Sequence, residues 1–152
     1  MGLGPAAVGL LIPIALELVA CGEEESVSIL DGPGGVPDGR TFLSSSVVEG
    51  GVSRPLVEGT RIRLEFADGD LSAYAGCNYL ELGNARQEGG RLVADQTSFT
   101  EMGCGREREA QDDWLADFLT SEPTVRLDGD SLRLTSEHTT IELVPRQATL
   151  GG

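Results

Sequence analysis

The chain has 152 residues and a formal net charge of −14 at pH 7, from 25 acidic and 11 basic side chains. This length accommodates one ordinary domain with accessory segments. A protein that binds nucleic acid needs a basic stripe or patch to neutralise phosphates, so this charge excludes nucleic acid from the expected partners. With 39% apolar and 24% charged residues, the composition is typical of a globular protein.

The N-terminal segment predicts a signal peptide followed by a lipid anchor. An unbroken apolar run covers residues 6–16, too short for the roughly 20 residues of a membrane-spanning helix but within the 7–15 of a signal-peptide core. Residues 18–21, Leu-Val-Ala-Cys, resemble the bacterial lipobox, which implies lipidation of Cys21 and removal of residues 1–20. The alternative is a buried core helix over residues 6–20 with Cys21 as an ordinary buried thiol.

The composition divides the rest of the chain into three parts. Residues 21–39 are rich in Glu, Gly and Pro, with Val36 as the one core-forming residue after Leu30, and we expect them to form a flexible acidic tether. A folded domain follows over residues 40–146, and residues 147–152 are expected to be a disordered tail. The anchor places the domain at the outer face of the cell membrane, or at the outer membrane of a two-membrane cell.

Alternating polar and apolar residues beyond Arg40 predict antiparallel strands joined by tight turns. Apolar residues occupy every second position of the best example, which is typical of a half-buried strand. Asp-Gly pairs between such segments favour hairpins because Gly accepts positive φ. The expected strands cover residues 60–66, 71–74, 125–127, 132–134 and 141–144, with turns at 68–70 and 128–130.

One segment, residues 107–120, has helical periodicity instead. Its apolar residues recur at spacings of three to five, and its acidic residues, Asp112 among them, fall mostly on the other face. We expect Trp114 and Phe118 to pack against an open face of the sheet. The predicted fold is therefore mainly β (α+β): a curled antiparallel sheet or partly open barrel, with one amphipathic helix packed on it.

Three motifs in this order resemble the META domain of HslJ-type proteins. They are the strand at 62–66, the Gly-Cys-Asn at 76–78, and a T-x-M-x-C pattern formed by Thr100, Met102 and Cys104. The resemblance runs from about Arg40 to Pro145. It implies a small β structure with a packed helix, in bacterial envelope or secreted proteins associated with stress tolerance, virulence or secretion and without an established catalytic activity.

Two further cysteines, Cys77 and Cys104, remain once Cys21 is assigned to the lipid. Because an exported domain lies in an oxidising compartment, we expect a disulfide between them. Two separate buried thiols, or a metal or redox role, are the alternatives. Gly76, Asn78, Thr100 and Met102 are interpreted as structural residues that shape a turn or bulge, with a polar ligand contact as the alternative for Asn78.

The sequence contains no strong candidate for catalysis. The single histidine, His138, lies in an expected hairpin loop, and triads or zinc sites need more partners than it offers. The Asp-Gly-Asp segments are too short for a calcium loop and are explained by turns. No catalytic residue, metal ligand or cofactor is therefore assigned, although a hydrolase that uses two carboxylates stays open.

These observations lead to one functional hypothesis and one alternative. The first is a monomeric, lipid-anchored binding or interaction module of the cell envelope, not an enzyme, whose partners are the membrane and an unidentified envelope protein or small ligand. The alternative is a barrel-like carrier of a hydrophobic ligand, which requires an unfilled apolar cavity above about 300 Å³.

Overall fold

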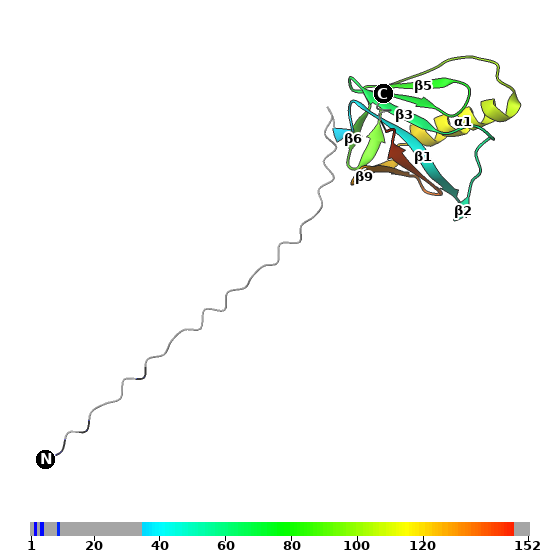
Figure 1. Ribbon diagram of the computed structural model, residues 1–152. Helices are drawn as coiled ribbons and strands as arrows, with labels where there is room; N and C mark the ends of the chain where they lie inside the picture. Colours follow the sequence, from blue (N-terminus) through cyan, green and yellow to red (C-terminus); the bar gives the residue numbers. More distant parts are fainter. Residues whose placement is uncertain (1, 3, 5–8, 10–34, 148–152) are drawn as a thin grey trace, which may run out of the picture.

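The computed structural model describes residues 2, 4, 9 and 35–147 (Figure 1). Cys21, most of the expected signal peptide and residues 148–152 lie outside the described residues. The predictions about lipidation and about the C-terminal tail therefore remain untested by the structure.

The described chain forms an antiparallel sheet and one helix, α1 (Arg106–Thr120) (Figure 1). Most of the strands are hydrogen-bonded in the order β6-β7-β9-β10-β11-β1-β3-β4-β5-β8, and β2 pairs with the far end of β1. This confirms the predicted fold class, a curled antiparallel sheet with one packed helix. The strands are β1 (Arg40–Glu49), β2 (Val52–Ser53), β3 (Arg63–Ala67), β4 (Asp70–Tyr74), β5 (Tyr79–Gly83), β6 (Arg86–Glu88), β7 (Arg91–Val93), β8 (Gln96–Phe99), β9 (Thr124–Asp128), β10 (Ser131–Thr135) and β11 (Thr139–Pro145).

A long bent hairpin connects the two ends of the sheet. β5 continues around a corner into β6, and β7 continues around a matching corner into β8. One half of the hairpin pairs β5 with β8 beside β4, while the other half pairs β6 with β7 beside β9. The sheet therefore curls into a half-barrel.

The two Asp-Gly hairpins form as expected but with different turns. Between β3 and β4, Asp68 and Gly69 are the two loop residues, and both have positive φ, 55° and 82°. Between β9 and β10, Asp128 still pairs with Ser131, so Gly129, with φ 59°, takes the first loop position. The first arrangement corresponds to a type I′ turn and the second to a type II′ turn, both of which match the strand twist.

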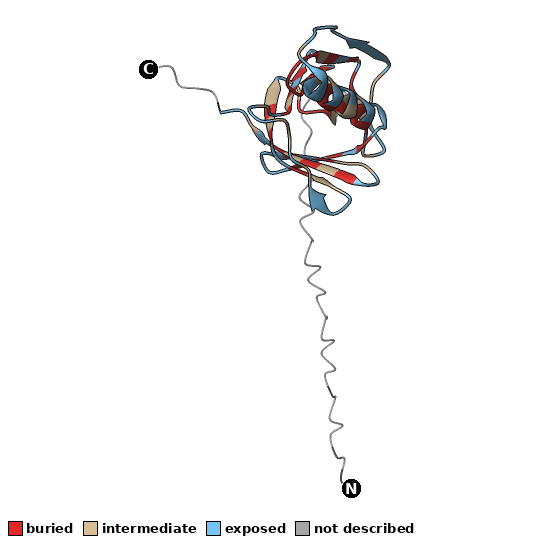
Figure 2. Cartoon of the chain, turned by 90° about the vertical axis from the view of Figure 1, so that its right-hand side faces the viewer, coloured by how far each residue is buried: buried red, intermediate tan, exposed pale blue. Residues whose placement is uncertain are grey.

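The core fills the inside of the curl. Apolar residues from the strands alternate inward, and the rings of Phe42 and Phe66 meet edge to face with centroids 6.1 Å apart. Helix α1 covers the open face with Leu115, Phe118 and Leu119, all buried, while its outer face is exposed (Figure 2). Trp114 is only half-buried and stacks on Phe118 at 6.2 Å.

Ordered packing begins within the segment that composition assigned to the tether. Val36 is fully buried in the core, and the N–H of Gly39 donates to the carbonyl of Phe66 at 2.7 Å. Within the described residues, no helix is both long and apolar enough to cross a membrane.

Candidate functional site

The Cys77–Cys104 disulfide is present, which confirms that prediction. The S–S distance is 2.01 Å, and the two Cα atoms are 5.7 Å apart. Cys77 lies in the four-residue loop between β4 and β5, and Cys104 lies near the end of the segment 100–105 between β8 and α1. The bond therefore fastens residues 100–104 onto the β4–β5 loop.

Asn78 provides a second attachment for the same segment. Its Oδ1 accepts the N–H of Met102 at 2.6 Å and the hydroxyl of Thr100 at 3.1 Å, while its Nδ2 donates to the Met102 carbonyl at 3.3 Å. The Thr100 hydroxyl in turn accepts the N–H of Tyr79 at 2.9 Å. Asn78 is buried, so these bonds have little competition from water. Its contribution comes from the side chain, not from an unusual φ.

Polar residues of α1 hold the β4–β5 loop from the other side. Asp112 is buried, and its Oδ2 accepts the N–H of Asn78 at 2.7 Å. Gln111 is also buried; it donates to the Ala75 carbonyl and to the Thr60 hydroxyl. The sequence pattern wrongly placed Asp112 on the solvent face. Gln111 lies four positions and Asp112 three positions before Leu115, so both share the buried face of the helix.

Gly76 is required where the loop approaches Thr60. Its φ is +132°, and a Cβ placed on it would lie 2.7 Å from Cγ2 of Thr60. Any side chain at position 76 would both strain the backbone and force the loop away from Thr60.

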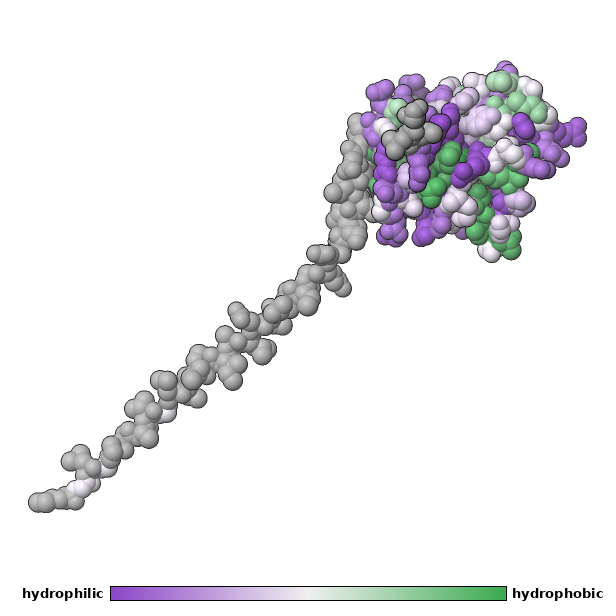
Figure 3. All heavy atoms as spheres, viewed as in Figure 1, coloured by the Kyte–Doolittle hydropathy of each residue, from purple (hydrophilic) through white to green (hydrophobic). Residues whose placement is uncertain are grey.

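Two apolar side chains are exposed here, one at the end of β8 and one in the fastened segment 100–104. Met102 uses its backbone N–H and carbonyl to bind Asn78, yet 58% of the residue is exposed, and Phe99 is 39% exposed. They border a shallow hollow of about 350 Å³ that also contains Glu101, Glu109 and Asp113. Figure 3 shows such exposed apolar groups as separate green patches within a mostly polar surface. This hollow and its rim, residues 99–103 with Glu109 and Asp113, are called the β8–α1 surface below.

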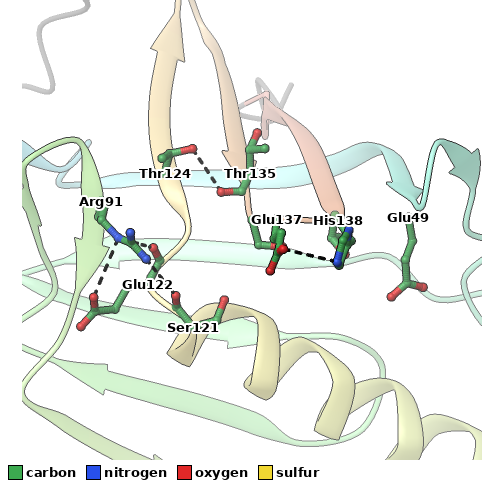
Figure 4. A pocket seen from close by; sticks show the side chains of 10 residues that line it. Glu49, Arg91, Ser121, Glu122, Thr124, Thr135, Glu137 and His138 are labelled. Carbon is green, nitrogen blue, oxygen red and sulfur yellow. Dashed lines mark hydrogen bonds and ion pairs between the residues drawn. The ribbon is translucent and has the colours of Figure 1, made fainter.

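A second, larger hollow of about 750 Å³ lies between the C-terminal end of α1 and the β10–β11 loop (Figure 4). Its lining consists of polar residues. Arg91 donates to the Glu122 carbonyl at 3.0 Å and lies 3.9 Å from the Glu122 carboxylate. His138 is exposed, with Nε2 3.8 Å from Oε1 of Glu137.

Glu49, at the far end of this hollow, already accepts two hydrogen bonds from other side chains. Its two oxygens accept Nε1 of Trp114 at 3.1 Å and Nη1 of Arg54 at 2.6 Å, and the Arg54 guanidinium lies 4.3 Å above the Trp114 ring. The Trp114 hydrogen bond and then the Arg54 contact hold the pKa of Glu49 below its ordinary value. Glu49 is thus an ionised structural acceptor.

The acids of this groove do not converge on one point. Figure 4 shows Glu122 and Glu49 at opposite ends, with Glu137 and His138 between them. Within the described residues, no three His, Cys, Asp or Glu side chains gather as metal ligands would. The described hollows are open and bordered largely by polar side chains, unlike the enclosed apolar interior that a hydrophobic carrier needs.

The fold and the fastened loop define a small antiparallel half-barrel with one helix and a disulfide. Residues 38–148 match the family model of the META domain, and the chain belongs to this family. The META domain is not a known enzyme family. No curated protein matches the chain significantly.

Two solved structures share the fold. One, described as the NMR structure of a protein from Burkholderia xenovorans, has a TM-score of 0.61 and 18% identity, covering 73% of this chain and 84% of that one. The other, also an NMR structure of a protein, has a TM-score of 0.52 and 19% identity, covering 69% of this chain and 87% of that one. At this identity the likeness concerns the fold alone.

Proposed function

We propose that the protein is a lipid-anchored binding module outside the cytoplasm, which acts at the cell envelope without catalysis. The disulfide supports the location, because disulfides persist in oxidising compartments and are rare in the cytosol. The lipobox-like residues 18–21 support the anchor on Cys21. A role in stress tolerance or secretion is part of this proposal, and its support is the resemblance to META-domain proteins associated with such roles.

The binding role depends on one observation: Phe99, at the end of β8, and Met102, in the fastened segment, are exposed although the backbone of both is held in place. Phe and Met are enriched at protein interfaces. A rigid segment loses little conformational entropy when a partner binds, so attachment through Cys104 and Asn78 favours binding. Two buried or half-buried acids already have structural hydrogen bonds: Glu49 accepts from Trp114 and Arg54, and Oδ2 of Asp112 accepts from the N–H of Asn78.

Two measurements test the proposal. The Cys21→Ala variant should leave the membrane fraction and lose the mass of the lipid; an unchanged mass in the membrane fraction contradicts the anchor. A photo-crosslinking amino acid at position 102 should capture a discrete envelope protein in cells. The matched control is position 52, because Val52 is also apolar and is 67% exposed. Equal or absent crosslinking at the two positions contradicts the binding role.

A further inference from the structure

Strand β8 is a free sheet edge next to the β8–α1 surface. Among the described strands, β8 is hydrogen-bonded to β5 and to no other. All four of its residues are exposed (Figure 2). An edge of this kind presents unpaired N–H and C=O groups, which another extended segment can pair with.

The register identifies the backbone groups that face outward. Thr100 lies opposite Tyr79 in the extension of the β5–β8 ladder, and its N–H donates to the Tyr79 carbonyl at 3.0 Å. Residues of an antiparallel strand alternate between pairing with one neighbour and facing the other side. The N–H and C=O groups of Thr97 and Phe99 therefore point away from β5.

The strand at the opposite end of the sheet, β6, is protected against pairing with another strand, whereas β8 is not. β6 carries Arg86 and Glu88, and Arg86 binds Glu88 at 2.6 Å and Asp95 at 2.7 Å. Such charged side chains are a common defence of edge strands against pairing. β8 reads Gln-Thr-Ser-Phe, without a charge or a proline.

We infer that β8 accepts an extended peptide segment of another protein as an additional strand, and that this segment carries apolar residues beside arginine or lysine. The inference rests on the proposed binding role and specifies its partner. An apolar side chain would contact Phe99 and Met102, while Glu101 and Asp113 beside the hollow would attract a cation. Backbone pairing would supply the affinity, and these contacts the specificity.

Charge repulsion disfavours two other segments that could pair with β8: a second copy of the chain and the chain's own N-terminal segment. A second copy carries the same net charge of −14 and is therefore repelled. Residues 23–25 of this chain are all Glu, so the N-terminal segment is also repelled. A basic partner is the one that the acidic β8–α1 surface attracts.

The probe is a capped heptapeptide of alternating valine and arginine, added to the full oxidised chain. Amide hydrogen exchange should slow by roughly tenfold or more at Thr97 and Phe99. The exchange at Ser98 and Thr100 should change little, because these amides already belong to the β5 ladder. Two control peptides are N-methylated either at every valine or at every arginine. Their charge is identical, and only one set of amides faces β8, so one control should bind and the other should not.

Protein variants provide a second, independent measurement. Thr97→Pro removes an outward N–H without breaking the β5 ladder and should weaken peptide binding by roughly tenfold or more. Unchanged protection of the Leu80 and Leu82 amides verifies that the variant is folded. Asp113→Arg should also weaken binding, whereas Asp117→Arg, an exposed residue one helical turn further along α1, should not.

Four results would overturn the inference. The first two are failure of the heptapeptide to bind and equal binding of the two methylated peptides. The other two are slowed exchange on peptide binding at amides other than those of Thr97 and Phe99, and slowed exchange at Thr97 and Phe99 before any peptide is added. The last result would assign the edge to this chain itself or to a second copy. None of the four bears on membrane fractionation or on crosslinking at position 102, so the proposed function is tested separately.

Discussion

The amide of Asn78 holds Met102 by both backbone groups, accepting its N–H at 2.6 Å and donating to its carbonyl at 3.3 Å. The side-chain amide of Asn78 thereby makes the same pair of hydrogen bonds to Met102 that a neighbouring strand would make. The Met102 side chain takes no part in this and is exposed. A residue of the family motif thus serves the fold through its backbone and leaves its side chain available for binding.

Replacing Asn78 should loosen this attachment. Asn78→Ala removes bonds to Thr100 and Met102 in a buried site, so we expect the free energy of unfolding in urea to fall by about 2 kcal/mol. Thr100→Val is the matched control, since it removes only the hydroxyl and should cost about 1 kcal/mol. Equal stability of Asn78→Ala and the native chain would contradict the assigned role.

Removing the disulfide should lower stability further. The double substitution Cys77→Ser with Cys104→Ser opens a loop between cysteines 27 positions apart. The chain-entropy relation predicts a loss of roughly 3–4 kcal/mol, measured by urea unfolding. Cys21→Ser should leave the unfolding curve unchanged. If the oxidised chain unfolded alike with and without a reducing agent, the bond would not stabilise the domain.

Position 76 should tolerate only glycine. Gly76→Ala combines a φ of +132° with a Cβ 2.7 Å from Thr60, so thermal and urea unfolding should show a loss of roughly 2–4 kcal/mol. Gly103→Ala is the control, because a Cβ there meets no atom within 4 Å and φ is not in the positive range. It should change stability by less than about 0.5 kcal/mol. Similar losses at the two positions would refute the steric argument.

A glycine at position 122 should stabilise the protein. Glu122 follows the end of α1 with φ 57°, a conformation that costs a residue with a side chain about 1–2 kcal/mol. Glu122→Gly relieves this cost and loses a 3.9 Å surface ion pair with Arg91. After the entropy of glycine is included, we expect a gain of roughly 0.5–1 kcal/mol in calorimetry. A loss would indicate that the carboxylate contributes more than its geometry suggests.

Acid should destabilise the β1–α1 contact through Glu49. Because the folded pKa of Glu49 is lowered, its contribution is complete above the ordinary value of 4.5 and disappears as the pH falls through the lower folded value. The stability difference between the native chain and Glu49→Gln should therefore be present at pH 7 and shrink below pH 4.5. Trp114 fluorescence during unfolding reports it directly. A difference independent of pH would exclude ionisation as the cause.

The sequence predicts the sheet and the helix well because their signals are local. Alternation and Asp-Gly pairs define β3, β4, β9 and β10, and spacing defines α1. The Cys77–Cys104 pair could be predicted from the two cysteines left after Cys21 and from the expected oxidising compartment. The burial of Gln111 and Asp112 could not, because these polar residues on an apolar helix face hydrogen-bond to backbone groups of a distant loop. Only Oδ2 of Asp112 is paired in this way; its Oδ1 is buried without a hydrogen-bond partner among the described residues. The free edge of β8 depends on strand order, which no local pattern specifies.

The central position of β1 in the sheet determines when the domain can fold. β1 pairs with β3 soon after it in the chain and with β11 at the other end of the domain, where Phe42 lies opposite Pro145. Pairings this distant in sequence slow folding, since the loop between them must be ordered first. A chain that emerges N-terminus first cannot complete its central strand until nearly the whole domain is available. The domain therefore cannot complete its fold before β11 is available, and a chain truncated before β11 would leave β1 open to aggregation.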